Sequence, residues 1–290
     1  MINIKIGLGT ILSDHAAQRA KFYFKNGNAI TIETHNMLGQ CNGRNNAWYE
    51  YEEFDEYYNR LEKLALYYKH SIAEGVDVLG LQEAPKDARL ADAFFQMLDL
   101  PNHWKYTHAQ NEHKQGMMLI YNSAVTGNET TYPALNLNGR AVSHFFEINN
   151  QPIELINIHA DFNFTCSYDI FELMNFSDTT KIRFGDHNGN PSKYVDLIIY
   201  DQSVPTSIVH KGGPNNFGDT DDDGNPQNYD GFACSNFDGH VEIYPSDFYQ
   251  IFYNPLTSNQ DIALIESNGY IKYIDSFKEI AVTGDLIEFI

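Results

Sequence analysis

Alternating apolar and polar positions predict most of the strands of this chain. Side chains of a strand point to opposite faces in turn, so a half-buried strand alternates and a fully buried one is a short apolar run. Segments of these two kinds are residues 2–8, 29–37, 76–82, 117–121, 142–148, 153–159 and 194–200. They predict a protein that is rich in sheet.

Helical periodicity is limited to three segments. Over residues 50–72, apolar side chains recur every three or four positions, which is typical of an amphipathic helix with one buried face. Gly75 supplies a stop signal for that helix. A second helix is predicted over 86–98, and a shorter one over 168–176. Strands interleaved with helices indicate an α/β fold with a mixed sheet.

The chain of 290 residues fits one domain. We expect a core over about 29–244, an extra N-terminal strand and a C-terminal extension over 245–290. The segment after residue 201 is rich in Asn, Asp, Gly and Pro up to residue 229, and short strand candidates follow it. A small C-terminal subdomain is the alternative.

Charge narrows the classes of partner. The chain has 39 Asp and Glu against 19 Lys and Arg, a formal charge of -20. Such a surface repels phosphates, which argues against a protein that holds nucleic acid by bulk charge. Bound cations can make the electrostatic potential at a site positive, so a phosphate-ester substrate is still compatible with this charge.

Cysteines and apolar runs bear on the compartment. The three cysteines are odd in number and widely spaced, which favours free thiols in a reducing, cytoplasmic compartment. The N-terminus shows no signal-peptide apolar region, although export by another route stays open. No apolar run approaches the ~20 residues that span a bilayer, so stable membrane insertion is not expected.

Four separated segments carry residues suited to phosphate-ester hydrolysis: 34–36, 76–83, 157–163, and 194–196 together with 238–240. A carboxylate at a strand exit, as at Glu83, suits a hard cation such as Mg²⁺. Asp161, oriented by Asn163 and Asn36, is a candidate base for an attacking water. His240 paired with Asp196 is a candidate donor to a phosphoryl oxygen.

In this order the segments resemble the endonuclease/exonuclease/phosphatase family, the deoxyribonuclease-I-like phosphodiesterases, over about residues 29–244. That family's chain has a Thr-x-Asn, a Leu-Gln-Glu, a Gly-x-x-x-x-Tyr strand, a Gly-Asp-Phe-Asn, a strand Asp and a closing Ser-Asp-His. The matching segments here are Thr34-His35-Asn36, Leu81-Gln82-Glu83, the run from Gly116 to Tyr121, Ala160-Asp161-Phe162-Asn163, Asp196, and the stretch from Ser235 to His240.

The resemblance implies a four-layer α/β sandwich of two packed mixed sheets flanked by helices, with the site at one end. It implies that Glu83 is the main ligand of Mg²⁺ or Mn²⁺, with Asn36 and Asp238 nearby. It also implies roles for a second set: Asp161 as base, Asn163 orienting it, and His240 on the scissile phosphate supported by Asp196.

Two departures from the family pattern affect these roles. Asn157-x-His159 runs directly into Asp161-x-Asn163, and the segment spans ~20 Å at about 3.3 Å per residue, too far for all four residues to meet one phosphate. Either His159 or the Asp161/Asn163 pair keeps its role, and we favour the pair. Gly239 also separates Asp238 from His240, which changes their relative directions.

Three further features bear on metal and substrate binding. Asp219, Asp221, Asp223, Asn225 and Asp230 follow the spacing of a calcium loop, with Gly224 at its sixth position. A structural Ca²⁺ site and a solvated acidic loop stay equally open. Residues 185–190 favour a hairpin turn. Arg140 could steady a substrate phosphate, although pairing with a carboxylate is favoured.

The sequence therefore predicts a metal-dependent phosphodiesterase or phosphomonoesterase. Nucleic acid, nucleotides and inositol or lipid phosphates are the substrate classes that fit. The alternative is a catalytically degenerate binding module of the same fold with a calcium-ordered loop.

Overall fold

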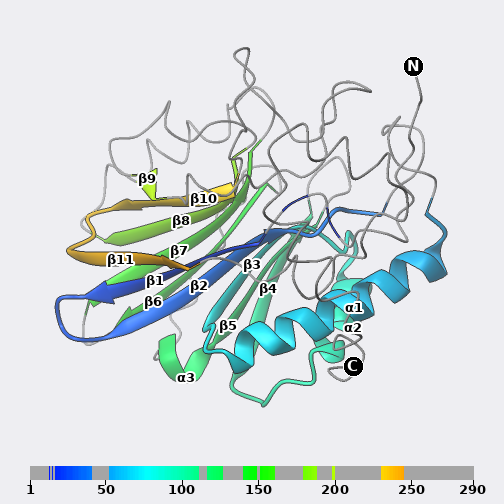
Figure 1. The fold of residues 1–290 in the computed structure, drawn as a ribbon, viewed down its shortest axis with the longest axis horizontal. Coiled ribbons are helices and arrows are strands. Elements are labelled where there is room, and N and C mark those ends of the chain that lie inside the picture. Colours follow the sequence, from blue (N-terminus) through cyan, green and yellow to red (C-terminus); the bar gives the residue numbers. More distant parts are fainter. Residues whose placement is uncertain are drawn as a thin grey trace, which may run out of the picture.

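The computed structural model describes residues 13, 15, 17–40, 52–110, 116–126, 140–148, 151–160, 179–187, 198–199 and 230–244. Two mixed β-sheets form its centre (Figure 1). The first sheet has the order β11-β1-β2-β3-β5-β4, and the second has the order β6-β7-β8-β10-β9.

The strands of the first sheet are β1 (Gln18–Phe24), β2 (Ala29–Asn36), β3 (Val78–Ala84), β4 (Trp104–Gln110), β5 (Gly116–Asn122) and β11 (Gly239–Tyr244). Those of the second are β6 (Ala141–Ile148), β7 (Gln151–His159), β8 (Thr180–Asp186), β9 (Ile198–Ile199) and β10 (Asp230–Ser235). Each sheet contains one parallel pair, β2 with β3 and β7 with β8, among antiparallel ones.

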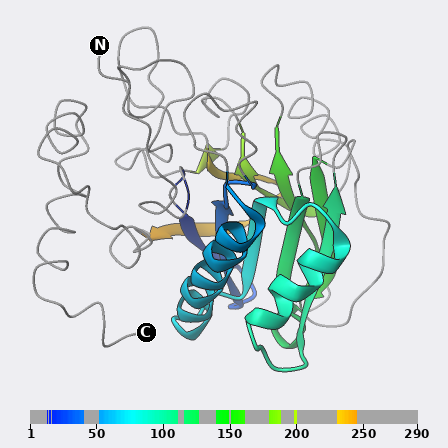
Figure 2. The ribbon, with the colours of Figure 1, turned by 90° about the vertical axis from the view of Figure 1, so that its right-hand side faces the viewer.

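Two helices cover the outer face of the first sheet (Figure 2). Helix α1 (Phe54–Ala73) begins with a capping box in which Glu53 and Glu56 satisfy each other's backbone N–H groups. Helix α2 (Ala88–Met97) begins at Asp87, whose side chain accepts from the Leu90 N–H. A short helix, α3 (Ser123–Thr126), follows β5.

Two apolar cores stabilise this arrangement. One lies between the helices and the first sheet and includes Tyr68, Phe94 and Leu79. The other lies between the two sheets and includes Phe22, Phe146 and Phe184. Because both faces of the first sheet are covered, β3 is an uninterrupted buried strand rather than an alternating one.

The predicted α/β class, with two packed mixed sheets flanked by helices, is confirmed. The helix over 50–72 and the helix over 86–98 are confirmed with small shifts of their ends. The predicted strand over 2–8, the helix over 168–176 and the extension over 245–290 lie outside the described residues. Within the ranges given above, no helix is long and apolar enough to cross a membrane.

Candidate active site

Both sheets end at one cluster of buried polar side chains. In the second sheet, His159 is the register partner of Asp186, and Asp186 is the partner of Asp230, so three neighbouring strands present these residues in one row. The first sheet contributes Asn36 at the end of β2 and Glu83 near the end of β3. All five are buried, and the parallel pairs explain why strand ends meet here.

The Glu83 carboxylate is held from three directions. Its Oε2 accepts from the Gly39 N–H at 3.0 Å. Its Oε1 lies 3.5 Å from Asn36 Nδ2 and 3.8 Å from His159 Nε2. Glu83 therefore links the first sheet to the row on the second.

Asp186 lies at the centre of the cluster. Asn36 Nδ2 donates to its Oδ2 at 2.8 Å, and His159 Nε2 lies 3.6 Å from the same oxygen. The oxygen of the Asn36 amide accepts from the Leu38 N–H at 3.0 Å. Asn36 thus directs its nitrogen at the two carboxylates. The prediction that Asn36 is a metal ligand does not agree with this orientation, because a ligand would present its oxygen.

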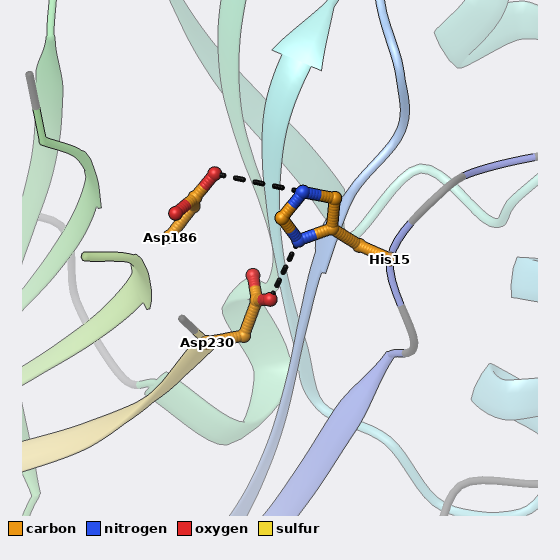
Figure 3. A group of neighbouring side chains, drawn as sticks. All are labelled: His15, Asp186 and Asp230. Carbon is orange, nitrogen blue, oxygen red and sulfur yellow. Dashed lines mark hydrogen bonds and ion pairs between the residues drawn. The ribbon is translucent and has the colours of Figure 1, made fainter. Parts of the chain in front are cut away.

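The last member of the cluster is His15, from the segment before β1 (Figure 3). Its Nδ1 lies 2.8 Å from Asp230 Oδ2, and its Nε2 lies 4.0 Å from Asp186 Oδ2. A bond from Nδ1–H to a buried carboxylate fixes the tautomer and turns Nε2 toward Asp186. His15 and Asp230 form a histidine–aspartate pair at the edge of the row.

The end of β2 holds the His15 segment in place. Ser13 Oγ donates to the backbone oxygen of Asn36 at 2.5 Å, and the His15 N–H donates to Ser13 Oγ at 3.1 Å. His35 Nε2 lies 3.1 Å from the backbone oxygen of His15, and its Nδ1 lies 2.6 Å from Tyr68 Oη. Burial lowers the pKa of His35 to about 3, so this ring is neutral and Nε2 is the donor.

The cluster fits a divalent cation. Asp186 and Asp230 are two buried carboxylates of the cluster, and Glu83 is a third, which shares the Asn36 amide with Asp186. Buried negative charge needs a cation or a proton to offset it. His15, Asp186 and Asp230 offer one nitrogen and two oxygens within 4.8 Å of one another. Carboxylate oxygens suit Mg²⁺ and Mn²⁺, and an imidazole ligand favours the transition metal.

Two predicted site residues lie elsewhere. His240 is on β11, 67% exposed, opposite Tyr23 of β1, and its ring stacks on the Tyr23 ring at 4.4 Å. Tyr23 is five residues along β1 from Gln18, the residue paired with Thr34, and a strand rises about 3.3 Å per residue. His240 is therefore roughly 17 Å from the cluster's end of the sheet, and the structure does not bring it together with Glu83.

Asp238 shares this remote position. It is 65% exposed and forms an ion pair with Lys25 in the turn between β1 and β2. The structure does not bring Asp238 together with Glu83, because the start of β11 pairs with the Phe24 end of β1, which is the end farther from the cluster.

The remaining predicted residues divide into two groups. Arg140 donates to the backbone oxygens of His159 and Ala160, both at 3.3 Å, so it steadies the end of β7 rather than pairing with a carboxylate. Asp230, predicted as the last calcium ligand, is directed to His15. The others lie outside the described residues: Asp161, Asn163, Asp196, Asp219, Asp221, Asp223 and Asn225.

Two cluster residues were missed in the sequence, although each carries a signal. Asp186 lies in Gly185-Asp186-His187-Asn188, a Gly-Asp-x-Asn that was interpreted as a hairpin turn; Gly185 and Asp186 belong to β8 instead. His15 ends the triplet Ser13-Asp14-His15, a Ser-Asp-His at the N-terminal end of the described chain. Both motifs resemble the Gly-Asp-Phe-Asn and Ser-Asp-His of the family pattern.

Searches against protein-family models and curated proteins found no match. Among solved structures, the chain is similar to an endonuclease/exonuclease/phosphatase family protein from Leptotrichia buccalis, with 14% identity, 71% of this chain and 87% of that chain covered, and a TM-score of 0.42. It is also similar to a mannosyl-6-phosphatase from Bacteroides thetaiotaomicron (11%, 71% and 85%, 0.45) and to truncated TDP2 from Caenorhabditis elegans (14%, 61% and 77%, 0.41).

Proposed function

We propose that the chain is a metal-dependent phosphoesterase, a divergent relative of the endonuclease/exonuclease/phosphatase enzymes. One observation carries the proposal. Five separate segments of the two sheets and of the N-terminal region deliver three carboxylates and two imidazoles to one buried cluster: Glu83, Asp186, Asp230, His15 and His159. A buried concentration of ionisable groups of this kind is typical of functional sites, which supports the proposal.

Glu83 would hold a Mg²⁺ or Mn²⁺ ion, and Asp186 would lie beside it. A bound divalent cation polarises a phosphoryl oxygen and stabilises the leaving oxygen. The protein's own part is to keep these ligands fixed, and Asn36 and the Gly39 N–H do so for Glu83 and Asp186.

Asp186 would take the role of base that the sequence had suggested for Asp161. Its Oδ2 has Asn36 Nδ2 as an orienting donor and lies within 3.6 Å of His159 Nε2, which can accept or return a proton. His159 in turn lies between two carboxylates, Glu83 and Asp186. This arrangement suits deprotonation of an attacking water.

His15 would take the role that the sequence had suggested for His240, and Asp230 that of Asp196. The Asp230 carboxylate holds the His15 ring through Nδ1, so a proton on Nε2 would be directed at charge that develops on a phosphoryl oxygen. The binding-module alternative rested on the compressed 157–163 segment and on Gly239. Gly239 begins β11, away from this cluster, and the 157–163 segment contributes His159 to it, so we favour the enzyme.

The substrate is proposed to be a small phosphate ester, such as a nucleotide or an inositol or sugar phosphate. The formal charge of -20 supports this choice, because an extended duplex needs many Lys and Arg contacts along its backbone. Single-stranded nucleic acid remains the next class to compare.

The test is hydrolysis of a generic phosphodiester, a phosphomonoester and single- and double-stranded DNA with Mg²⁺, Mn²⁺, Ca²⁺ or EDTA. Glu83→Gln is the site variant, and Glu242→Gln, on exposed β11, is the matched control. We expect turnover that needs Mg²⁺ or Mn²⁺, a loss of about a hundredfold or more in Glu83→Gln, and wild-type rates in the control. Equal rates in both variants would contradict the proposal.

A further inference from the structure

Glu83 lies in an irregular part of β3. Leu81 is the register partner of Met118, and the next pair is Ala84 with Gly116, so Gln82 and Glu83 together oppose one residue of β5. This is a β-bulge, and such bulges redirect a side chain next to a site. The φ of Glu83 is 49°, in the left-handed region that residues with a β-carbon adopt only where their surroundings enforce it.

The surroundings that enforce it come from the other sheet. Asn157 of β7 donates through Nδ2 to the backbone oxygens of Leu81, at 3.1 Å, and Met118, at 2.8 Å, which pair with each other on one side of the bulge. Its Oδ1 accepts from Gln82 Nε2 at 2.5 Å. One buried amide thus bonds to both strands of the bulge and to a residue within it.

Gln82 extends this contact to β2. Its Nε2 also donates to Thr34 Oγ1 at 2.9 Å and to the Gly80 backbone oxygen at 3.0 Å. We name the two amides, Asn157 and Gln82, the inter-sheet clamp. Gly80 leaves room for it, because a Cβ there would lie 3.2 Å from Asn157 Cγ and 2.2 Å from the Phe184 ring.

The clamp lies directly beneath the cluster. Gln82 precedes Glu83, and Asn157 lies two residues before His159 on the same face of β7. Glu83 Oε1 and His159 Nε2 lie 3.8 Å apart across the two sheets. The hydrogen bonds between the neighbouring amides of Gln82 and Asn157 therefore fix this distance. Packing of apolar side chains alone would not fix the register of β3 at the bulge.

We infer that Asn157 is a positioning residue that acts on the site through Glu83. This inference rests on the proposed metal-dependent function. A purely structural Asn157 would change stability alone, whereas a positioning Asn157 also changes how Glu83 meets a cation. The two roles differ in a measurement made on folded protein.

The experiment measures Mn²⁺ affinity by calorimetry for wild type, Asn157→Leu, Glu83→Gln and the double variant, each checked for folding by circular dichroism. The relevant Mn²⁺ site is the one whose affinity Glu83→Gln lowers. We expect Asn157→Leu to weaken this affinity at least tenfold, and to change it less than twofold in the Glu83→Gln background. Ser71→Ala, which removes the buried bonds of Ser71 to Glu33 and Arg19, is the control and should lower Tm without changing the affinity.

Gln82→Met keeps the packing and removes the bonds to Asn157 and Thr34, so it replaces Asn157→Leu if that variant does not fold. A crystal structure of the folded variant gives a second readout, and we expect a shifted β3–β5 register or a Glu83 φ that is negative. An unchanged bulge, or the same affinity loss with and without Glu83, would overturn the inference. If wild type hydrolysed no phosphoester while the clamp results held, the proposed function alone would fall.

Discussion

His35 makes the stability of the fold depend on pH in a predictable direction. The ring is fully buried between Tyr68 and the His15 backbone, and burial lowers its pKa from 6.5 to about 3. In the unfolded chain the ring binds a proton below about pH 6.5, whereas the folded protein does not bind one until about pH 3. The unfolded state therefore binds more protons across this window, and stability falls as the pH falls from 6.5 toward 3.

The size follows from the shift. One pKa unit corresponds to 1.36 kcal/mol, so the loss between pH 8 and pH 5 is about 2 kcal/mol from this residue alone. His35→Gln removes the titration while it keeps one N–H donor for the His15 oxygen and one acceptor for the Tyr68 hydroxyl. Other groups titrate in both proteins and cancel in the comparison.

The assay is urea unfolding followed by circular dichroism at pH 8, 7, 6 and 5. Wild type should lose about 2 kcal/mol more than His35→Gln between the two ends of this range. Parallel stability curves for the two proteins would show that the folded state protonates His35 as readily as the unfolded state. That result would refute a neutral His35 ring that donates to the His15 backbone oxygen and accepts from the Tyr68 hydroxyl, and with it the way in which the ring holds the His15 segment.

Two further predictions concern the cores. Gly80→Ala would place a Cβ 2.2 Å from the Phe184 ring, and overpacking of this kind costs about 1–3 kcal/mol, which a lower Tm would report; an unchanged Tm would mean that the sheets can separate freely. Burial raises the pKa of Cys234 to about 12, so its thiol should resist iodoacetamide at pH 8 in folded protein and react after unfolding, as followed by peptide mass spectrometry. Rapid labelling of the folded protein would contradict this placement.

The sequence predicted the elements whose pattern is local. Helix α1 was predicted because its apolar residues recur every three or four positions. Strand β3 was predicted because it is an apolar run. Strand β8 was missed, since its Lys181 and Arg183 suggest a solvated segment, yet both are buried and Lys181 lies 3.2 Å from Glu154 of β7. The ion pair with Glu154 on the neighbouring strand offsets the burial of Lys181.

The site was predicted in part for the same reason. Glu83 and His159 end predicted strands, so their motifs point to the correct end of the fold. Asp186, Asp230 and His15 meet through the order β7-β8-β10 and through the position of the N-terminal segment, and strand order is not a property of local sequence. His240 was misplaced because its motif carries no information about its pairing with β1.

The most direct test of the account compares Asp186→Asn with Asp238→Asn in Mn²⁺-dependent hydrolysis of a phosphodiester. Both carboxylates belong to motifs that resemble the same family, but Asp186 is buried at the centre of the cluster and Asp238 is exposed at the far end of the sheet. The account predicts a loss of kcat of about a hundredfold or more for Asp186→Asn and less than twofold for Asp238→Asn. Wild-type turnover in Asp186→Asn, or a large loss in Asp238→Asn alone, would contradict it.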